Sequence, residues 1–135
     1  MKKILVIDNT TEKMYKSINT LKAKYKVDIA GGTQQVKQYY DNPYFDHLHY
    51  FDIIILESFL PRDGMFTLEE TDHGIYTGWC LCKKFLKDYK KPIVIWTQYT
   101  IDEYKNKKWE ANVCFHQKNE KDDTSLLTII DEIIG

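Results

Sequence analysis

The sequence predicts a single α/β domain in three layers, a five-stranded parallel sheet between two layers of helices. Short apolar segments alternate with amphipathic segments along the whole chain, and this alternation favours parallel strands with helices on both faces. The strand segments are apolar at nearly every position, which is typical of strands buried on both faces. The length of 135 residues suits one domain with a substantial core. We therefore expect residues 1–135 to form one domain.

Each predicted element has a recognisable pattern. Met14, Ile18, Leu21 and Tyr25 recur at helical spacing in the first helix. The fourth helix begins with a capping box at Thr100, but its apolar periodicity is poor. Five such strands favour the order 2-1-3-4-5. The predicted strands are 2–7 (KKILVI), 26–30 (KVDIA), 51–56 (FDIIIL), 91–96 (KPIVIW) and 112–117 (NVCFHQ), and the predicted helices are 14–25, 33–40, 78–89, 100–111 and 124–134.

Two connections are longer than is usual for this architecture. One runs through DNPYFDHLHY at residues 41–50. The other covers residues 58–77, about 20 residues where most connections take 2–6. It contains Gly64 and Gly74 and follows the third strand. This connection is either a functional lid or a tolerated insertion.

Composition excludes several classes of function. A net charge of −1, with 43% hydrophobic and 29% charged residues, indicates a soluble protein without the basic field that attracts nucleic acid. The apolar runs are too short to span a membrane, and the start MKKILVID lacks the features of a signal peptide. We expect a cytoplasmic protein that binds neither nucleic acid nor membrane. Cys80-Leu81-Cys82 lacks the spacing of redox and zinc motifs, so buried thiols are expected.

Polar side chains follow four of the predicted strands. Asp8 and Asn9 follow the first, Glu57 the third, Thr97 the fourth and Lys118 the fifth. Ligands of open parallel sheets bind at the carboxyl ends of the strands. Paired acids can hold Mg²⁺, a hydroxyl and an ammonium can hold phosphate oxygens, and a carboxylate can receive a phosphoryl group. The alternative is that Glu57 and Lys118 form an inert structural ion pair.

Four motifs carry a resemblance to a known family. ILVIDN, DIIILESFLPRDG, PIVIWTQ and VCFHQK stand in order at the four strand ends. They resemble the receiver domain of two-component response regulators over essentially the whole chain, which implies the flavodoxin-like receiver fold. The resemblance assigns one role to each of six positions: Asp8 and Asn9 to the acidic pair that holds Mg²⁺, Glu57 to the phospho-acceptor, Thr97 to the switch hydroxyl, Lys118 to the lysine that pairs with the phosphoryl group, and Phe115 to the aromatic switch.

Two of these six positions, and the residue that follows Lys118, depart from the family pattern. Glu57 replaces aspartate and places its carboxylate one methylene farther out, and a displacement of about 1 Å can reduce a positioned reaction roughly 100-fold. Asn9 is neutral where the family has a second acid, which weakens a Mg²⁺ site. Asn119 stands where the family usually has proline, so its peptide bond should be trans. We hypothesise an atypical receiver that is not phosphorylated in the usual way, with Glu57 acting as a partial mimic of the phosphorylated state.

Three classes of function remain open. The first is a stand-alone signalling module, not an enzyme, that binds a protein partner or a second copy of itself. The resemblance places this contact on the face of the fourth helix, fifth strand and fifth helix, including Tyr104, Lys105, Lys107, Lys108 and Trp109. The second is a conventional phosphorelay receiver that uses Glu57 or another acid such as Asp63. The third is a small-molecule or enzymatic role under residues 58–77. No cofactor is required, and if Mg²⁺ binds, Asp8 and Glu57 would hold it.

Overall fold

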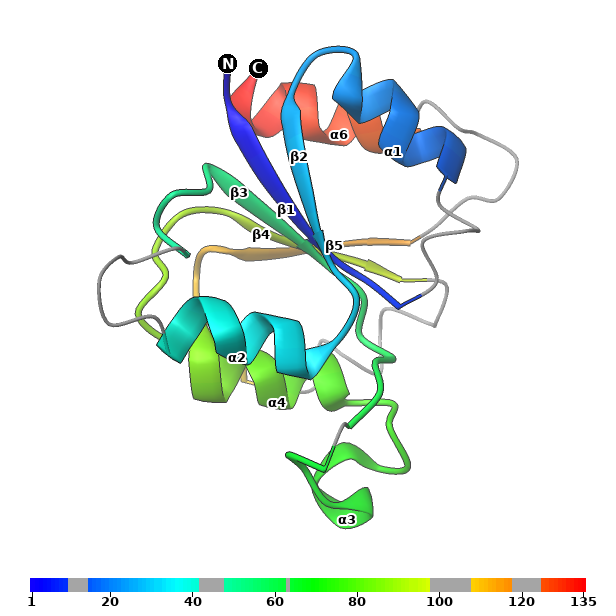
Figure 1. The fold of residues 1–135 in the computed structure, drawn as a ribbon, viewed down its shortest axis with the longest axis vertical. Coiled ribbons are helices and arrows are strands. Elements are labelled where there is room, and N and C mark those ends of the chain that lie inside the picture. The colour runs from blue at the N-terminus through cyan, green and yellow to red at the C-terminus, as the bar shows by residue number, and fades with distance from the viewer. Residues whose placement is uncertain (10–14, 42–47, 63, 98–107, 118–124) are drawn as a thin grey trace.

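The five strands form one parallel sheet in the order β2-β1-β3-β4-β5, which confirms the predicted fold class and strand order. A computed structural model describes residues 1–9, 15–41, 48–62, 64–97, 108–117 and 125–135. The strands are β1 (Lys3–Ile7), β2 (Lys26–Ala30), β3 (Ile53–Leu56), β4 (Ile93–Thr97) and β5 (Val113–Gln117). Figure 1 shows β2 at one edge of the sheet, beside β1.

Helices cover both faces of this sheet (Figure 1). The helices α1 (Tyr15–Lys22) and α6 (Ser125–Ile134) lie on one face, and α2 (Thr33–Asp41) and α4 (Thr77–Phe85) lie on the other. A fifth helix, α3 (Leu68–Thr71), lies away from the sheet in the connection between β3 and α4. None of the helices in the described part of the chain has both the length and the apolarity to cross a bilayer.

Successive strand residues supply the cores of the two opposite faces. Side chains alternate between the faces of a strand, so Ile53 and Ile55 pack towards α1 and α6 while Ile54 and Leu56 pack towards α2 and α4. β1 and β4 divide in the same way. This division explains the continuous apolar runs: an alternating pattern would have left one face polar. Cys80 and Cys82 are buried, as expected.

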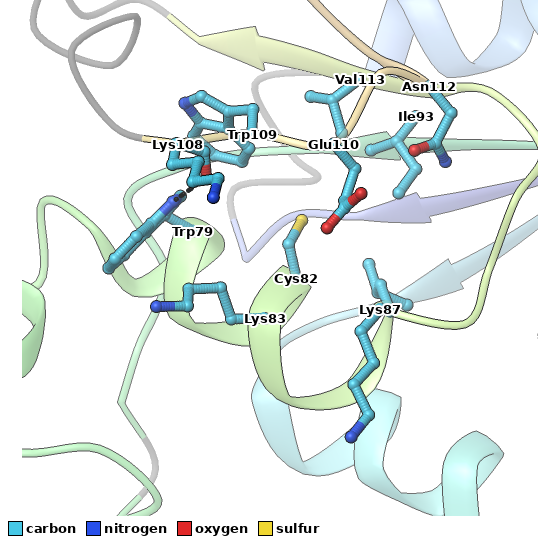
Figure 2. A pocket seen from close by; sticks show the side chains of 11 residues that line it. Trp79, Cys82, Lys83, Lys87, Ile93, Lys108, Trp109, Glu110, Asn112 and Val113 are labelled. Carbon is cyan, nitrogen blue, oxygen red and sulfur yellow. Dashed lines mark hydrogen bonds between the residues drawn. The ribbon is translucent and has the colours of Figure 1, made fainter.

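The predicted helix over residues 100–111 is wrong at its end. Residues 100–107 lie outside the described residues, and 108–111 are not helical. They lead into β5 through an irregular stretch and a turn, in which the backbone N–H of Val113 donates to the carbonyl of Glu110 at 3.2 Å. Trp79 of α4 contacts this segment, because its indole Nε1 donates to the carbonyl of Lys108 at 3.3 Å (Figure 2). A tertiary contact thus satisfies the carbonyl of Lys108.

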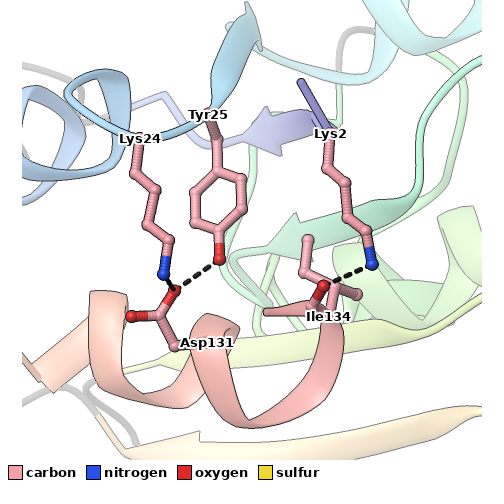
Figure 3. Close-up of polar contacts among 5 residues, drawn as sticks. All are labelled: Lys2, Lys24, Tyr25, Asp131 and Ile134. Carbon is pink, nitrogen blue, oxygen red and sulfur yellow. Dashed lines mark hydrogen bonds and ion pairs between the residues drawn. The ribbon is translucent and has the colours of Figure 1, made fainter.

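Polar contacts join the first and last elements of the chain (Figure 3). The Asp131 carboxylate accepts hydrogen bonds from the Lys24 ammonium, at 2.9 Å, and from the Tyr25 hydroxyl. The Lys2 ammonium donates to the carbonyl of Ile134. The hydrogen bond from Lys24, followed by that from Tyr25, holds the pKa of Asp131 below its usual value. These contacts link α6 both to the turn between α1 and β2 and to Lys2, directly before β1.

The lowered pKa of Asp131 predicts a pH dependence of folding stability. A carboxyl group with a depressed folded-state pKa stabilises the fold above its unfolded pKa, near 3.9, and this contribution is lost as the pH falls through the folded pKa. We expect Asp131→Asn to have a lower urea midpoint than the wild type at pH 7. Below about pH 4, the difference between the two urea midpoints should become smaller. Urea titrations from pH 3 to pH 7 measure this effect. An equal gap at every pH would contradict the assignment.

Candidate functional site

The carboxyl ends of β1, β3 and β4 bring three of the predicted site residues to one edge of the sheet. The backbone N–H of Glu57 donates to the carbonyl of Ile7 at 3.0 Å, and that of Asp8 donates to the carbonyl of Ala30 at 3.1 Å, so the parallel ladder continues through both acids. Asp8, Glu57 and Thr97 are buried, with exposed fractions of 1%, 5% and 0%. Asn9 is exposed.

The Glu57 carboxylate is held by its own loop. Its Oε1 accepts hydrogen bonds from the backbone N–H of Ser58 at 2.8 Å and of Phe59 at 3.2 Å. Burying a carboxylate is costly unless hydrogen bonds replace its water, and these two donors provide such replacement. One oxygen of the longer side chain is thus directed at the turn that leaves β3.

The first turn of α4 packs directly against this segment. The backbone N–H of Gly78 donates to the carbonyl of Ser58 at 2.9 Å. A Cβ at Gly78 would lie 2.7 Å from the Glu57 carbonyl oxygen and 2.8 Å from the Ser58 Cα. Only a residue without a side chain allows this close approach. No pattern in the sequence indicates this contact, because Gly78 lies far from Glu57 and Ser58 along the chain.

The connection over residues 58–77 is a folded excursion. Thr67 and Glu70 form a capping box on α3: Thr67 Oγ1 accepts from the backbone N–H of Glu70 at 3.0 Å, and the Glu70 carboxylate accepts from the backbone N–H of Thr67 at 3.2 Å. The Ser58 hydroxyl donates to the carbonyl of Ile75 at 3.2 Å, which closes the excursion at its base. The Thr-x-x-Glu pattern of this capping box is visible in the sequence. Asp63 lies outside the described residues.

The remaining predicted residues are only partly described. Phe115 is half-buried on β5, and its ring meets that of Trp109 edge to face, with centroids 5.0 Å apart. Lys108 and Trp109 lie on the segment that enters β5. Lys118, Asn119, Tyr104, Lys105 and Lys107 lie outside the described residues. The assignments for these five residues therefore stay predictions.

A Mg²⁺ site at Asp8 and Glu57 that is weak or absent stays a prediction. Carboxylate oxygens are the protein ligands that this ion uses, and Oε1 of Glu57 already accepts two backbone hydrogen bonds. Asn9 offers a neutral amide in place of a second acid. Among the described residues, no group of three or more His, Cys, Asp or Glu side chains gathers as a metal site.

Solved structures share this fold. The chain is similar to a response regulator receiver domain of Methanospirillum hungatei (21% identity, TM-score 0.67, 98% of this chain and 92% of that chain). It is also similar to the response regulator TrrA of Thermotoga maritima (19%, 0.67, 99% and 100%) and to the beryllofluoride-activated receiver domain of DrrB (17%, 0.70, 99% and 97%). The chain thus has the flavodoxin-like fold of receiver domains. No protein-family model matches the chain, and a comparison with curated proteins finds no match either.

Proposed function

We propose that this protein is a receiver-type signalling module that acts by binding a protein partner or a second copy of itself, without the usual phosphorylation of an aspartate. The position of Glu57 carries this proposal. It stands at the end of β3, buried beside the end of β1, where the four motifs place the phospho-acceptor.

The environment of Glu57 supports a structural role for this acid. Attack on a phosphodonor needs a carboxylate oxygen at a defined distance, and a displacement of about 1 Å can slow a positioned reaction roughly 100-fold. The Glu57 side chain is one methylene longer than aspartate, and its Oε1 is held by the N–H groups of Ser58 and Phe59. Asn9 leaves Asp8 as the one acid directly after β1. All three features act against Mg²⁺-dependent phosphorylation.

The described part of the β5 face supports a contact with another protein. Trp109 and Phe115 form an aromatic pair there, and Lys108 adds an exposed cation. Aromatic side chains are enriched where proteins meet. The net charge of −1 gives no basic field, and Lys108 alone makes no basic patch. Both points support a protein partner over a nucleic acid or a membrane.

Treatment with a phosphodonor tests this proposal. We expect the wild-type protein, incubated with Mg²⁺ and acetyl phosphate, to keep its unmodified intact mass. The matched variant Glu57→Asp with Asn9→Asp restores both acids of the family pattern, and we expect it to gain one phosphoryl group that is lost when Mg²⁺ is chelated. Intact-mass spectrometry reads both results. A stoichiometric adduct on the wild type that disappears in Glu57→Gln would instead establish the conventional phosphorelay function.

A further inference from the structure

A cavity of about 280 Å³ lies between α4 and the segment that enters β5 (Figure 2). It shares no lining residue with the strand-end site of Asp8, Glu57 and Thr97. Its inner wall is apolar, formed by Leu86, Ile93 and Val113. A volume of this size is near the lower limit for small-molecule sites, roughly 300–1,000 Å³. A ligand of one or two fused rings is therefore the size that fits.

Two tryptophans flank the cavity, and other residues hold both of them. The Trp79 indole Nε1 donates to the Lys108 carbonyl at 3.3 Å, which ties α4 to the opposite wall. Trp109 packs edge to face on Phe115, with an angle of 80° between the rings. Because these contacts exist within the protein alone, a ligand would meet walls that are already formed, which reduces the entropy lost on binding.

Charge is divided between two parts of the cavity. Lys83 and Lys108 direct their ammonium groups to the side of Trp79, and the Lys83 Nζ lies 4.3 Å from the centroid of the Trp79 ring (Figure 2). Glu110 directs its carboxylate towards Cys82, while Lys87 points away from the other labelled groups (Figure 2). In the described part of the chain, no carboxylate forms an ion pair with Lys83 or Lys108.

We propose that this cavity binds a small planar aromatic anion that carries an N–H donor. The ring stacks on the tryptophans, as planar rings do in other aromatic sites. The anionic group lies at Lys83 and Lys108, where charge-assisted hydrogen bonds form. The N–H donates to the Glu110 carboxylate, so rings with such a donor bind better than rings without one. The same carboxylate repels a ligand whose anionic group lies beside Glu110. This inference goes beyond the proposed signalling function and does not depend on it.

Three fluorinated probes that share one ring separate the contribution of the charge from that of the N–H donor. The first is 6-fluoroindole-4-carboxylate, which carries the charge and the N–H on opposite sides of the ring system. The second is its carboxamide, which lacks the charge, and the third is its N-methyl derivative, which lacks the donor. ¹⁹F NMR titration of the full chain gives a dissociation constant for each. We expect the first probe to bind about three- to tenfold more tightly than either of the others.

Charge-neutral variants then locate the binding. Lys108→Gln and Lys83→Gln should each weaken the carboxylate probe about two- to fivefold and leave the carboxamide unchanged. Glu110→Gln should reduce the preference for the probe with a free N–H, because a neutral amide oxygen accepts a weaker hydrogen bond than a carboxylate. The matched control is Lys22→Gln, an exposed lysine on α1 at the opposite face of the sheet, and it should change no constant. Glu57→Gln should also leave the binding intact, so failure of the signalling proposal would not affect this result.

Three results would overturn the proposal. The first is the absence of binding at millimolar probe, and the second is equal affinity for the three probes. The third is a change in the dissociation constant of the carboxylate probe that is no larger in Lys83→Gln and Lys108→Gln than in Lys22→Gln. Circular dichroism of each variant checks that the fold is retained. Because the three cavity substitutions alter side chains without removing buried apolar groups, we expect all of them to fold.

Discussion

The Gly78→Ala variant is expected to lose about 1–3 kcal/mol of unfolding free energy, as overpacked sites typically do. The added Cβ would lie 2.7 Å from the Glu57 carbonyl oxygen and 2.8 Å from the Ser58 Cα. Both are backbone atoms, so no rotamer change relieves the clash. Either α4 or the end of β3 must shift, and the Gly78 N–H hydrogen bond to the Ser58 carbonyl would be strained with it. Urea denaturation followed by circular dichroism measures the loss.

The matched control for this prediction is Gly31→Ala. A Cβ at Gly31 would meet one side-chain atom, Gln35 Nε2, at 3.9 Å, which is ordinary contact. Gly31 is also exposed. We expect a change within about 0.5 kcal/mol, as at other surface positions. If Gly78→Ala were as stable as Gly31→Ala, the close packing of α4 on Glu57 would be disproved.

The Phe51→Ala variant is expected to lose about 3–5 kcal/mol, the usual loss when a buried aromatic ring is truncated. Phe51 is 1% exposed and lies two residues before the start of β3. Tyr39 and Tyr50 meet its ring edge to face, with centroids 5.7 Å and 5.3 Å away. Its carbonyl also accepts the Tyr89 hydroxyl at 3.0 Å. A domain with a total stability of about 5–15 kcal/mol would be left close to unfolding.

Phe59→Ala makes the same chemical change at a less buried site. Phe59 is 40% exposed in the excursion after β3. We expect a smaller loss, about 1–2 kcal/mol, because only part of this side chain is removed from water. Thermal or urea unfolding of the two variants side by side gives the difference. Equal losses would mean that the aromatic cluster around Phe51 contributes no more than an exposed ring.

The strands β1, β3 and β4 were predictable because they are covered on both faces. Burial of both faces requires an apolar residue at nearly every position, and such apolar runs can be recognised in the amino-acid sequence alone. Their ends were less predictable: residues 51 and 52 were assigned to the third strand, but β3 begins at Ile53. The Asp52 carboxylate accepts the backbone N–H of Lys3 at 2.8 Å, a contact between residues distant in sequence.

The third predicted helix shows the same limit for helices. The apolar spacing of residues 78–89 predicts one helix with Tyr89 on its apolar face. α4 ends at Phe85, yet the Tyr89 side chain is buried, and its hydroxyl donates to the carbonyl of Phe51 at 3.0 Å. The periodicity thus correctly predicted the burial of Tyr89 and wrongly predicted its backbone.

The sequence by itself determined the sheet, its strand order and the identity of the residues at the strand ends, because a parallel sheet imposes a repeating pattern on its own chain. It also showed that a glutamate stands where the receiver motif has its acceptor. Only the tertiary structure decided where that carboxylate points, how closely α4 approaches it through Gly78, and that Trp79, Lys83 and Glu110 share one cavity. Those features depend on distances between segments far apart in the chain. No periodic pattern in the amino-acid sequence indicates such distances.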